Sequence, residues 1–352
     1  MLDRLITAYR PYFPALAFIA HAVLACVSLT ANDTVIVRPD KKGTSQVQRA
    51  GTILEYTGKE LRLEVLGGRV EIIPAERIVE IRTAKSDAHK QAEQLLADDR
   101  LDSALGAFKQ AKQQEQRPWM VRQISAQLVG CYLEQNAIEQ AGDEFLSIVA
   151  SDPETFHIDV IPLPWRLQPI SPVVETKARV WIQREKQPLA VLLGASWLFG
   201  SADRSTALQT LQKLASSSDR TVSLLAEAQL WRTKLVTANE NDVLRWQEIW
   251  ERFPDSLRPT ATFILAESYA RVNRPETSAA YYLQLPILAP QQRGAAADGL
   301  LFAGKQLEKI GQRTQAVGLY RELADHYSAS PSAAEARARL ASLTPNPKDK
   351  NP

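Results

Sequence analysis

The stretch of the sequence closest to a known chemical motif is a phosphate-loop pattern. Gly299, Gly304 and Lys305 fit the spacing GxxxxGK, in which backbone amides and the lysine hold nucleotide phosphates. That motif also needs a preceding strand, and a serine or threonine after the lysine to reach magnesium. Gln306 occupies the hydroxyl position, and the segment falls in an expected helix, where Gly304 takes a packing position. We therefore expect no nucleotide site here.

Elsewhere the sequence does not bring together a nucleophile, a base and an orienting group. Residues 194–198 begin like the nucleophile elbow of a hydrolase but lack its second glycine. The four histidines are scattered, and none belongs to the zinc pattern HExxH. His157 and Asp159 fit one face of a strand, yet two ligands do not make a metal site. The sequence thus predicts a protein that is not an enzyme and holds no metal or other cofactor.

The composition is that of an ordinary folded protein. The chain has 352 residues, 45% apolar and 23% charged, which suits two or three domains or an elongated array. Its 42 basic and 40 acidic side chains give a net charge of +2, so nucleic acid is not an expected partner. Two cysteines, Cys26 and Cys131, are too few for a disulfide framework or a four-ligand zinc site.

A degenerate repeat dominates the chain after residue 85. In each copy a turn residue ends one helix, and the next helix carries a small residue followed one turn later by an aromatic residue. The clearest copies are Asp99, Ala104 and Phe108; Asn136, Ala141 and Phe145; and Gly311, Ala316 and Tyr320. The large position recurs with gaps of 37, 66, 35, 36 and 38 residues, at Phe108, Phe145, Leu211, Trp246, Tyr282 and Tyr320. This pattern predicts a mostly α-helical chain of paired helices.

The pattern resembles the tetratricopeptide repeat, whose period is about 34 residues. In the C-terminal part, residues 246–256 recur loosely as 320–328, and residues 263–269 complete the phrase. Over residues 240–343 the chain is similar to two bacterial envelope families. One is the periplasmic tetratricopeptide protein that works beside the Tol–Pal system, and the other is the lipoprotein of the outer-membrane β-barrel assembly machine. The resemblance implies an α-solenoid of helical hairpins whose concave surface binds other proteins.

Residues 32–84 have a different periodicity. Leu61, Leu63 and Val65 alternate with polar residues, and the glycines of segment 66–69 indicate a tight hairpin. This pattern predicts four or five short strands in a small SH3-like or Sm-like β module. Because the periodicity changes at residue 84, we expect the module to fold as its own unit and to act as a structural or docking cap.

The remaining boundaries follow from composition. Helical repeats are expected at 85–153 and 177–343, separated by a proline-rich loop at 154–176. Dense prolines exclude a helix in that loop, but apolar residues such as Trp165 favour a loop packed across the helices over a free linker. The polar tail, 344–352, is expected to be disordered.

Residues 1–31 predict export. Two arginines precede an apolar run at 11–25, and small and polar residues follow it, as in a secretory signal peptide. A permanent membrane anchor is the alternative. Pro14 and His21 interrupt the run, however, and it is shorter than the roughly 20 residues that span a membrane.

Residues 23–26, Val-Leu-Ala-Cys, resemble a bacterial lipobox, in which the cysteine is lipidated and begins the mature chain. Leu24 stands where a smaller residue is commoner, so Cys26 fits an ordinary apolar position of the signal equally well. Both alternatives predict a periplasmic location. The membrane is then a partner only through a lipid on Cys26.

The repeat frame also predicts a binding surface, because the first helices of such repeats line the concave side. The frame set by Tyr269 and Gly311 places seven residues there: Phe263, Glu267, Arg271, Leu301, Lys305, Glu308 and Lys309. Phe263 and Leu301 are expected on the exposed wall, where apolar groups mark a contact. The charged residues then form its rim.

Three functions follow from these observations. A non-catalytic scaffold of the bacterial envelope, binding a protein or peptide, accounts best for the repeats. A structural spacer is one alternative. The other is an accessory subunit of an envelope complex or enzyme, or an enzyme with a site near the proline-rich loop, and the missing catalytic set argues against the enzyme.

Overall fold

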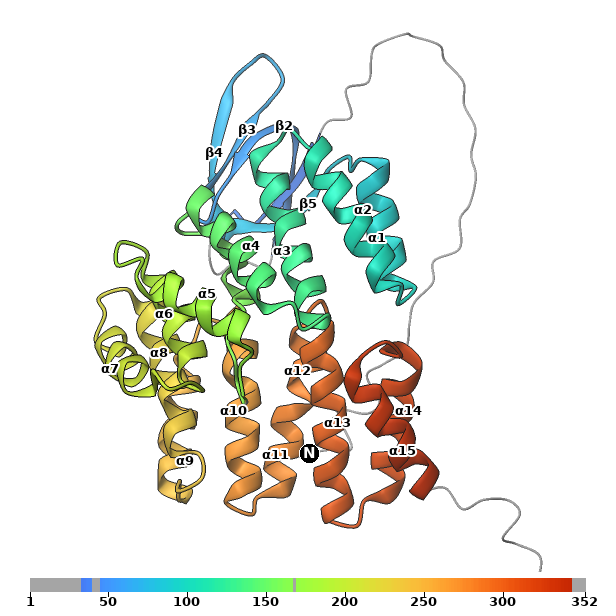
Figure 1. Ribbon diagram of the computed structural model, residues 1–352. Coiled ribbons are helices and arrows are strands. Elements are labelled where there is room, and N and C mark those ends of the chain that lie inside the picture. The colour runs from blue at the N-terminus through green and yellow to red at the C-terminus, as the bar shows by residue number, and fades with distance from the viewer. Residues whose placement is uncertain (1–32, 40–44, 167–168, 344–352) are drawn as a thin grey trace, which may run out of the picture.

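The computed structural model describes residues 33–39, 45–166 and 169–343. The protein is mostly helical, with an antiparallel five-stranded sheet at the N-terminal end of this part (Figure 1). The prediction of a mostly α chain with a small N-terminal β module is confirmed at this level. The predicted export signal with Cys26, and the polar tail, lie outside the described residues.

The sheet has the strand order β4-β3-β2-β1-β5. Its strands are β1 (Asp33–Val37), β2 (Val47–Tyr56), β3 (Glu60–Glu64), β4 (Val70–Pro74) and β5 (Ile78–Arg82). The long β2 pairs with β1 through its first half and with β3 through its second, with a register shift between Ile53 and Glu55. A short 3-10 helix, η3 (Ala75–Arg77), leads from β4 into β5, which crosses over to pair with β1.

The helices follow the sheet mostly as antiparallel hairpins. In chain order they are α1 (Asp87–Ala97), α2 (Leu101–Gln114), α3 (Pro118–Glu134), α4 (Ile138–Ser151), η4 (Phe156–Val160), α5 (Pro172–Ile182), α6 (Pro188–Leu198), α7 (Arg204–Ala215), α8 (Arg220–Lys234), α9 (Glu240–Trp250), α10 (Arg258–Arg271), α11 (Pro275–Tyr282), α12 (Gln284–Leu288), α13 (Arg293–Lys309), α14 (Arg313–His326) and α15 (Pro331–Leu343). Within the described ranges, no helix is long and apolar enough to cross a membrane.

Four hairpin turns share one geometry. Asp99, Asn136, Asn273 and Gly311 have φ angles of 60, 56, 58 and 77°, in the left-handed region. After each of them, the next amide donates to a carbonyl five residues earlier, as from Arg100 to Leu95 at 2.8 Å. Glycine, asparagine and aspartate tolerate this helix-ending conformation better than other residues. Three of these residues are the turn positions that the repeat pattern marks.

The large position of every repeat lies in the protein interior. All six residues are buried: Phe108, Phe145, Leu211, Trp246, Tyr282 and Tyr320. Small partners allow close approach, and Gly304 is the clearest case, because a Cβ atom there would lie 2.4 Å from the Tyr320 ring. Packing therefore explains the glycine of the phosphate-loop pattern, which sits inside helix α13.

The core of the sheet continues into the first three helices. Leu61 and Leu63 on its inner face belong to the same apolar cluster as Phe108 of α2 and Ile124 of α3. A second cluster runs from α3 to α15. The inner face of the sheet therefore shares its apolar core with helices of the next segment, and the expectation that residues 32–84 fold as their own unit stays a prediction.

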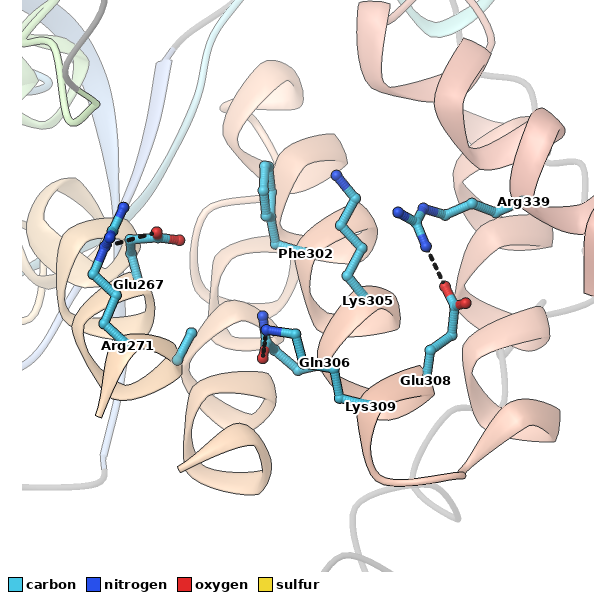
Figure 2. A pocket seen from close by; sticks show the side chains of 9 residues that line it. Glu267, Arg271, Phe302, Lys305, Gln306, Glu308, Lys309 and Arg339 are labelled. Carbon is cyan, nitrogen blue, oxygen red and sulfur yellow. Dashed lines mark hydrogen bonds and ion pairs between the residues drawn. The ribbon is translucent and has the colours of Figure 1, made fainter. Parts of the chain in front are cut away.

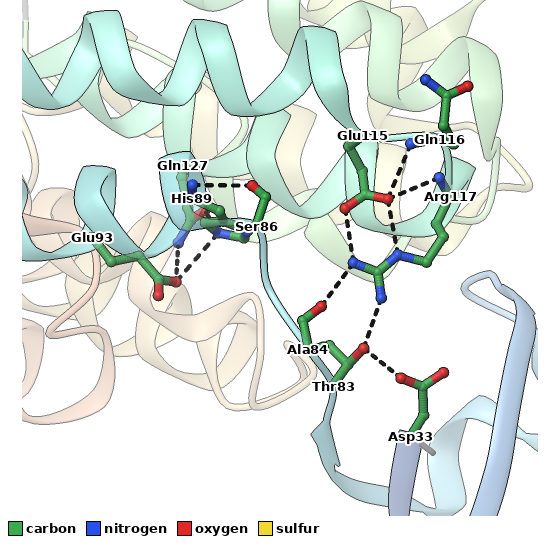
Figure 3. A network of polar contacts seen from close by, with 10 residues as sticks. All are labelled: Asp33, Thr83, Ala84, Ser86, His89, Glu93, Glu115, Gln116, Arg117 and Gln127. Carbon is green, nitrogen blue, oxygen red and sulfur yellow. Dashed lines mark hydrogen bonds and ion pairs between the residues drawn. The ribbon is translucent and has the colours of Figure 1, made fainter. Parts of the chain in front are cut away.

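Polar contacts also fix the sheet to the helices (Figure 3). Arg117, just before α3, donates to the Thr83 hydroxyl at 2.8 Å and to the Ala84 carbonyl at 2.9 Å. Thr83 in turn donates to Asp33, whose other carboxylate oxygen accepts from the Ile53 amide at 2.8 Å. The chain between sheet and α1 is thus held at the point where the periodicity changes.

The proline-rich segment packs against the helices. Ile161 and Leu163 are buried, and the Trp197 indole donates to the Pro162 carbonyl at 2.8 Å. It is therefore a packed loop and not a free linker. Helix α5 begins inside the predicted loop, at Pro172, because Ser171 caps it and proline suits a first helical position.

The first and last hairpins touch. The Asp99 carboxylate, in the α1–α2 turn, accepts hydrogen bonds from Arg293 of α13 at 2.5 Å and from Ser328 at 2.6 Å. Figure 1 shows the end of α3 above the start of α13. Segments about 200 residues apart therefore brace each other, and this closure positions α13, which carries most of the site described next.

Candidate binding groove

A groove lies between helices α10, α13 and α15, with a volume of about 610 Å³ (Figure 2). It is lined by Glu267, Ala270, Arg271, Phe302, Lys305, Gln306, Glu308, Lys309 and Arg339. Five of the seven residues predicted for the binding surface are among them: Glu267, Arg271, Lys305, Glu308 and Lys309. The structure thus brings together the charged residues that the repeat frame selected.

Helical spacing explains why these side chains meet. Lys305, Gln306 and Lys309 stand three, four and seven residues after Phe302, so the four side chains share one face of α13. Glu267 and Arg271 of α10 are four residues apart in the same way. Helix α15 follows the last hairpin and contributes Arg339 from the opposite side.

Cations outnumber acids in the groove. Four basic and two acidic side chains line it. Glu267 pairs with Arg271 at 3.3 Å, and Glu308 pairs with Arg339 at 2.8 Å. Lys305 reaches out of the groove lining to Glu335, at 2.6 Å.

Lys309 differs from the other three cations. Its ammonium group donates to the Gln306 amide oxygen at 3.1 Å, and no carboxylate lies within ion-pair distance of it in the described part of the chain. Its charge is therefore available to an anionic group of another molecule.

Two buried tyrosines hold the acids of the groove. The Tyr282 hydroxyl donates to Glu267 at 2.8 Å, and the Tyr320 hydroxyl donates to Glu308. Burial raises the pKa of both phenols far above their usual range, so both remain protonated donors. The large residue of the repeat therefore fills the core and also orients a carboxylate in the groove, a role that sequence reasoning missed.

An aromatic ring forms the apolar part of the groove. Phe302 contacts two cations: the Lys305 nitrogen is 4.6 Å from its ring centroid, and the Arg166 guanidinium is 4.5 Å away. Arg166 comes from the proline-rich segment and pairs with Asp298 of α13 at 2.9 Å. Cation–π contacts of this kind favour an ordered ring.

Phe263 and Leu301 do not stand on the exposed wall, so this part of the sequence prediction is wrong. They expose only 7% and 3% of their surface. Phe263 packs edge-on against Tyr282 and Phe302, with centroids 5.3 and 5.5 Å apart. Helix α10 is buried along most of its length because neighbouring hairpins cover it on both sides. The spacing of Lys305 and Lys309 would have selected Phe302, one residue after Leu301.

The serine and histidine motifs considered for catalysis or metal binding lie outside this groove. Ser196 is buried inside helix α6, away from any elbow-like turn. His157 and Asp159 do lie together, beside a hollow of about 250 Å³. Burial lowers the pKa of His157 to about 4, so it is neutral near pH 7. Among the described residues, no group of three or more histidine, cysteine or acidic side chains is arranged to hold a metal ion.

Comparison with known proteins adds no assignment to this geometry. No protein-family model matches the chain. No curated protein matches it either. The residues of the groove are therefore the basis for a functional assignment.

Proposed function

We propose that the protein is a non-catalytic interaction scaffold that binds an extended segment of another protein in the groove between α10, α13 and α15. The observation that carries this proposal is the convergence of cationic side chains from three helices around Phe302. A ring flanked by charges is the usual composition of an interface centre and its rim.

The charge of the groove indicates the chemistry of the partner. Two of the four cations face the two groove acids, Lys305 faces Glu335, and Lys309 faces none in the described part of the chain. A partner segment with carboxylates and one apolar side chain complements this arrangement. Such complementarity acts mainly on association rate and specificity.

We further propose a tetratricopeptide-like solenoid with an SH3-like or Sm-like β module. The left-handed turns at Asp99, Asn136, Asn273 and Gly311, and the buried large position of each repeat, support the first. The crossover of β5 to β1 after a 3-10 helix, and the bent β2 shared by two strand pairs, support the second.

The proposed location is the bacterial periplasm, in solution or at a membrane through a lipid on Cys26. It depends on the sequence pattern of residues 1–31. A structural spacer is the second candidate function. The contacts of Asp99 with Arg293 and Ser328 favour it, because they brace the two ends of the helical array.

A photo-crosslinking amino acid at position 270 of the full chain, where the uncharged Ala270 lines the groove, tests the scaffold proposal. We expect crosslinks to one partner from envelope extracts, and their loss when Lys305→Glu is added. The matched control places the crosslinker at Lys234, an exposed lysine at the end of α8. Equal crosslinking from both positions, or no effect of Lys305→Glu at low salt, would favour the spacer.

A further inference from the structure

The hairpin formed by β3 and β4 exposes apolar side chains that the sheet does not use. Leu66, at the tip, is fully exposed, and Ile72 exposes 62% of its surface. Val70, two residues before Ile72 on the same face of β4, is also exposed. Single exposed apolar residues are common, but three on one hairpin indicate a contact surface.

The backbone presents Leu66 outward. Gly67 and Gly68 have φ angles of 90 and 76°, which glycine adopts at little cost. The Val65 amide donates to the Arg69 carbonyl at 2.9 Å and closes the turn. The inner face of the hairpin, by contrast, is committed to the core, where Leu61 is buried. The hairpin projects beyond the helices in Figure 1.

The start of β1 lies at the same end of the sheet as this tip. Asp33 pairs with Gly51, and the next residue of β2, Thr52, pairs with Glu64 at the base of the tip. Asp33 stands eight positions after Ala25, the end of the apolar run. Even fully extended, eight steps along the chain span at most about 29 Å. Anything that holds the apolar run also holds the hairpin close by.

We infer that the β3–β4 hairpin contacts a lipid bilayer, with Leu66 entering the apolar boundary and Val70 and Ile72 beside it. The inference rests on the alternative in which the N-terminal run stays in the chain as a membrane anchor, because a retained run brings a bilayer near. The hairpin itself carries three acidic and two basic side chains, Glu60, Arg62, Glu64, Arg69 and Glu71. Attraction to anionic lipid therefore cannot drive the contact, and burial of apolar surface must.

This contact orients the molecule. The helices that line the groove lie at the end opposite to the hairpin (Figure 1). A bilayer under the hairpin leaves the groove facing away from the membrane, open to a partner. The inference goes beyond the proposed scaffold function and does not depend on it, since it uses different residues.

Lipid-quenched fluorescence on the full chain tests the contact. A polarity-sensitive dye is attached to Leu66→Cys in a Cys26→Ser background; Cys131 is buried and stays unlabelled. The control carries the dye at Val236→Cys, which is 70% exposed in the turn after α8. With phosphatidylcholine vesicles, we expect a blue shift and quenching by doxyl-labelled lipid at position 66, and neither at position 236.

The lipid composition and a second variant complete the test. The signal at position 66 should persist at high salt and without anionic lipid. In vesicle flotation, Leu66→Asn combined with Ile72→Asn should lower binding on the order of ten-fold, while Val236→Asn should not. A dye at position 66 that stays in water, whether or not the chain binds vesicles, overturns the inference. So does a signal that high salt abolishes.

Discussion

Helix α13 carries a cluster of charges at each end, and the two clusters differ in how completely the protein satisfies them. At its start, Arg293 exposes 17% of its side chain and meets Asp99, 18% exposed, and Glu134, 12% exposed. In the groove near its end, Arg339 exposes 33% and Lys309 has no carboxylate partner in the described residues.

The same residue types therefore serve two purposes. At the start of α13, the partners of Arg293 come from α1–α2, α3 and the α14–α15 loop, including a contact with the Tyr327 ring at 5.3 Å. Burial makes this junction a structural contact, since removing one partner would leave another charge unpaired. The groove is open and has a cation to spare, as a binding surface requires.

The largest expected effect concerns the floor of the groove. Phe263→Ala removes a buried ring that contacts Tyr282 and Phe302, and should lower the free energy of unfolding by about 3–5 kcal/mol. Phe302→Ala removes a half-buried ring from the groove lining and should cost less stability while weakening partner capture. Urea unfolding and crosslinking from position 270 measure the two effects.

If Phe263→Ala left stability intact and abolished capture, the ring would belong to the binding surface after all. The distinction between a buried, structural Phe263 and a partner-binding Phe302 would then be wrong.

The junction at the start of α13 provides the next test. Arg293→Met leaves Asp99 and Glu134 without their cation and should destabilise the protein by about 2–3 kcal/mol, below the range for fully buried pairs because some exposure remains. Arg339→Met in the groove is the matched variant and should cost only about 0–1 kcal/mol. Equal losses in urea unfolding would contradict the distinction between the two clusters.

Two glycine-to-alanine variants near the groove distinguish the effect of tight side-chain packing from the effect of helix propensity. Gly304→Ala places a methyl group against the Tyr320 ring and should destabilise by about 1–3 kcal/mol. It should also disturb Glu308, which that tyrosine holds. Gly318→Ala in α14 meets no described atom within 4 Å and should stabilise the helix by about 0.5–1 kcal/mol. Thermal unfolding of both variants would reveal the opposite signs, and a neutral Gly304→Ala would mean that the ring can yield.

The sequence selected the charged residues of the groove because charged side chains at helical spacing share one face of a helix and tend to remain at the surface. Glu267 and Arg271, or Lys305 and Lys309, must share a helix face whatever packs on the other side. Apolar residues carry no such constraint. Phe263 and Leu301 fit an exposed wall as well as a core, and only the packing of neighbouring hairpins decides between them.

The contact between the first and last hairpins could not be predicted from the local sequence. Asp99 marks a helix-ending turn, which predicts its left-handed backbone but not its bonds to Arg293 and Ser328. Likewise the alternation at 61–65 predicts strands, but says nothing of the helices that cover them. Periodicity reports the local face of an element, whereas the partner of that face depends on the whole chain.

The shifted pKa of Glu134 makes the stability of the junction at the start of α13 depend on pH. Burial raises its pKa, nearby Arg293 opposes this, and the charge of Asp99 adds to it, with a resulting pKa of about 7 instead of 4.5. The Cys131 thiol beside it stays neutral, because burial raises its pKa to about 12. Asp99 has the opposite shift, since hydrogen bonds from Ser328, Ala329 and Arg293 outweigh burial and lower its pKa.

The sign of the effect follows from proton uptake. Between about pH 4.5 and 7 the folded protein holds a proton on Glu134 that the unfolded chain has lost, so this residue makes stability fall as pH rises through that window. Asp99 does not offset it there, because its stabilisation is lost only as pH falls below its unfolded value of 3.8. Glu134→Gln should therefore flatten the decline and stabilise the protein at pH 8 by about 1–2 kcal/mol, while changing little at pH 4.5. Urea midpoints for both proteins from pH 4.5 to 8 measure the difference. If the urea midpoints of the two proteins change with pH in parallel, Glu134 is ionised throughout as a partner of Arg293. The junction would then consist of ionised pairs, like those of the groove, despite its burial.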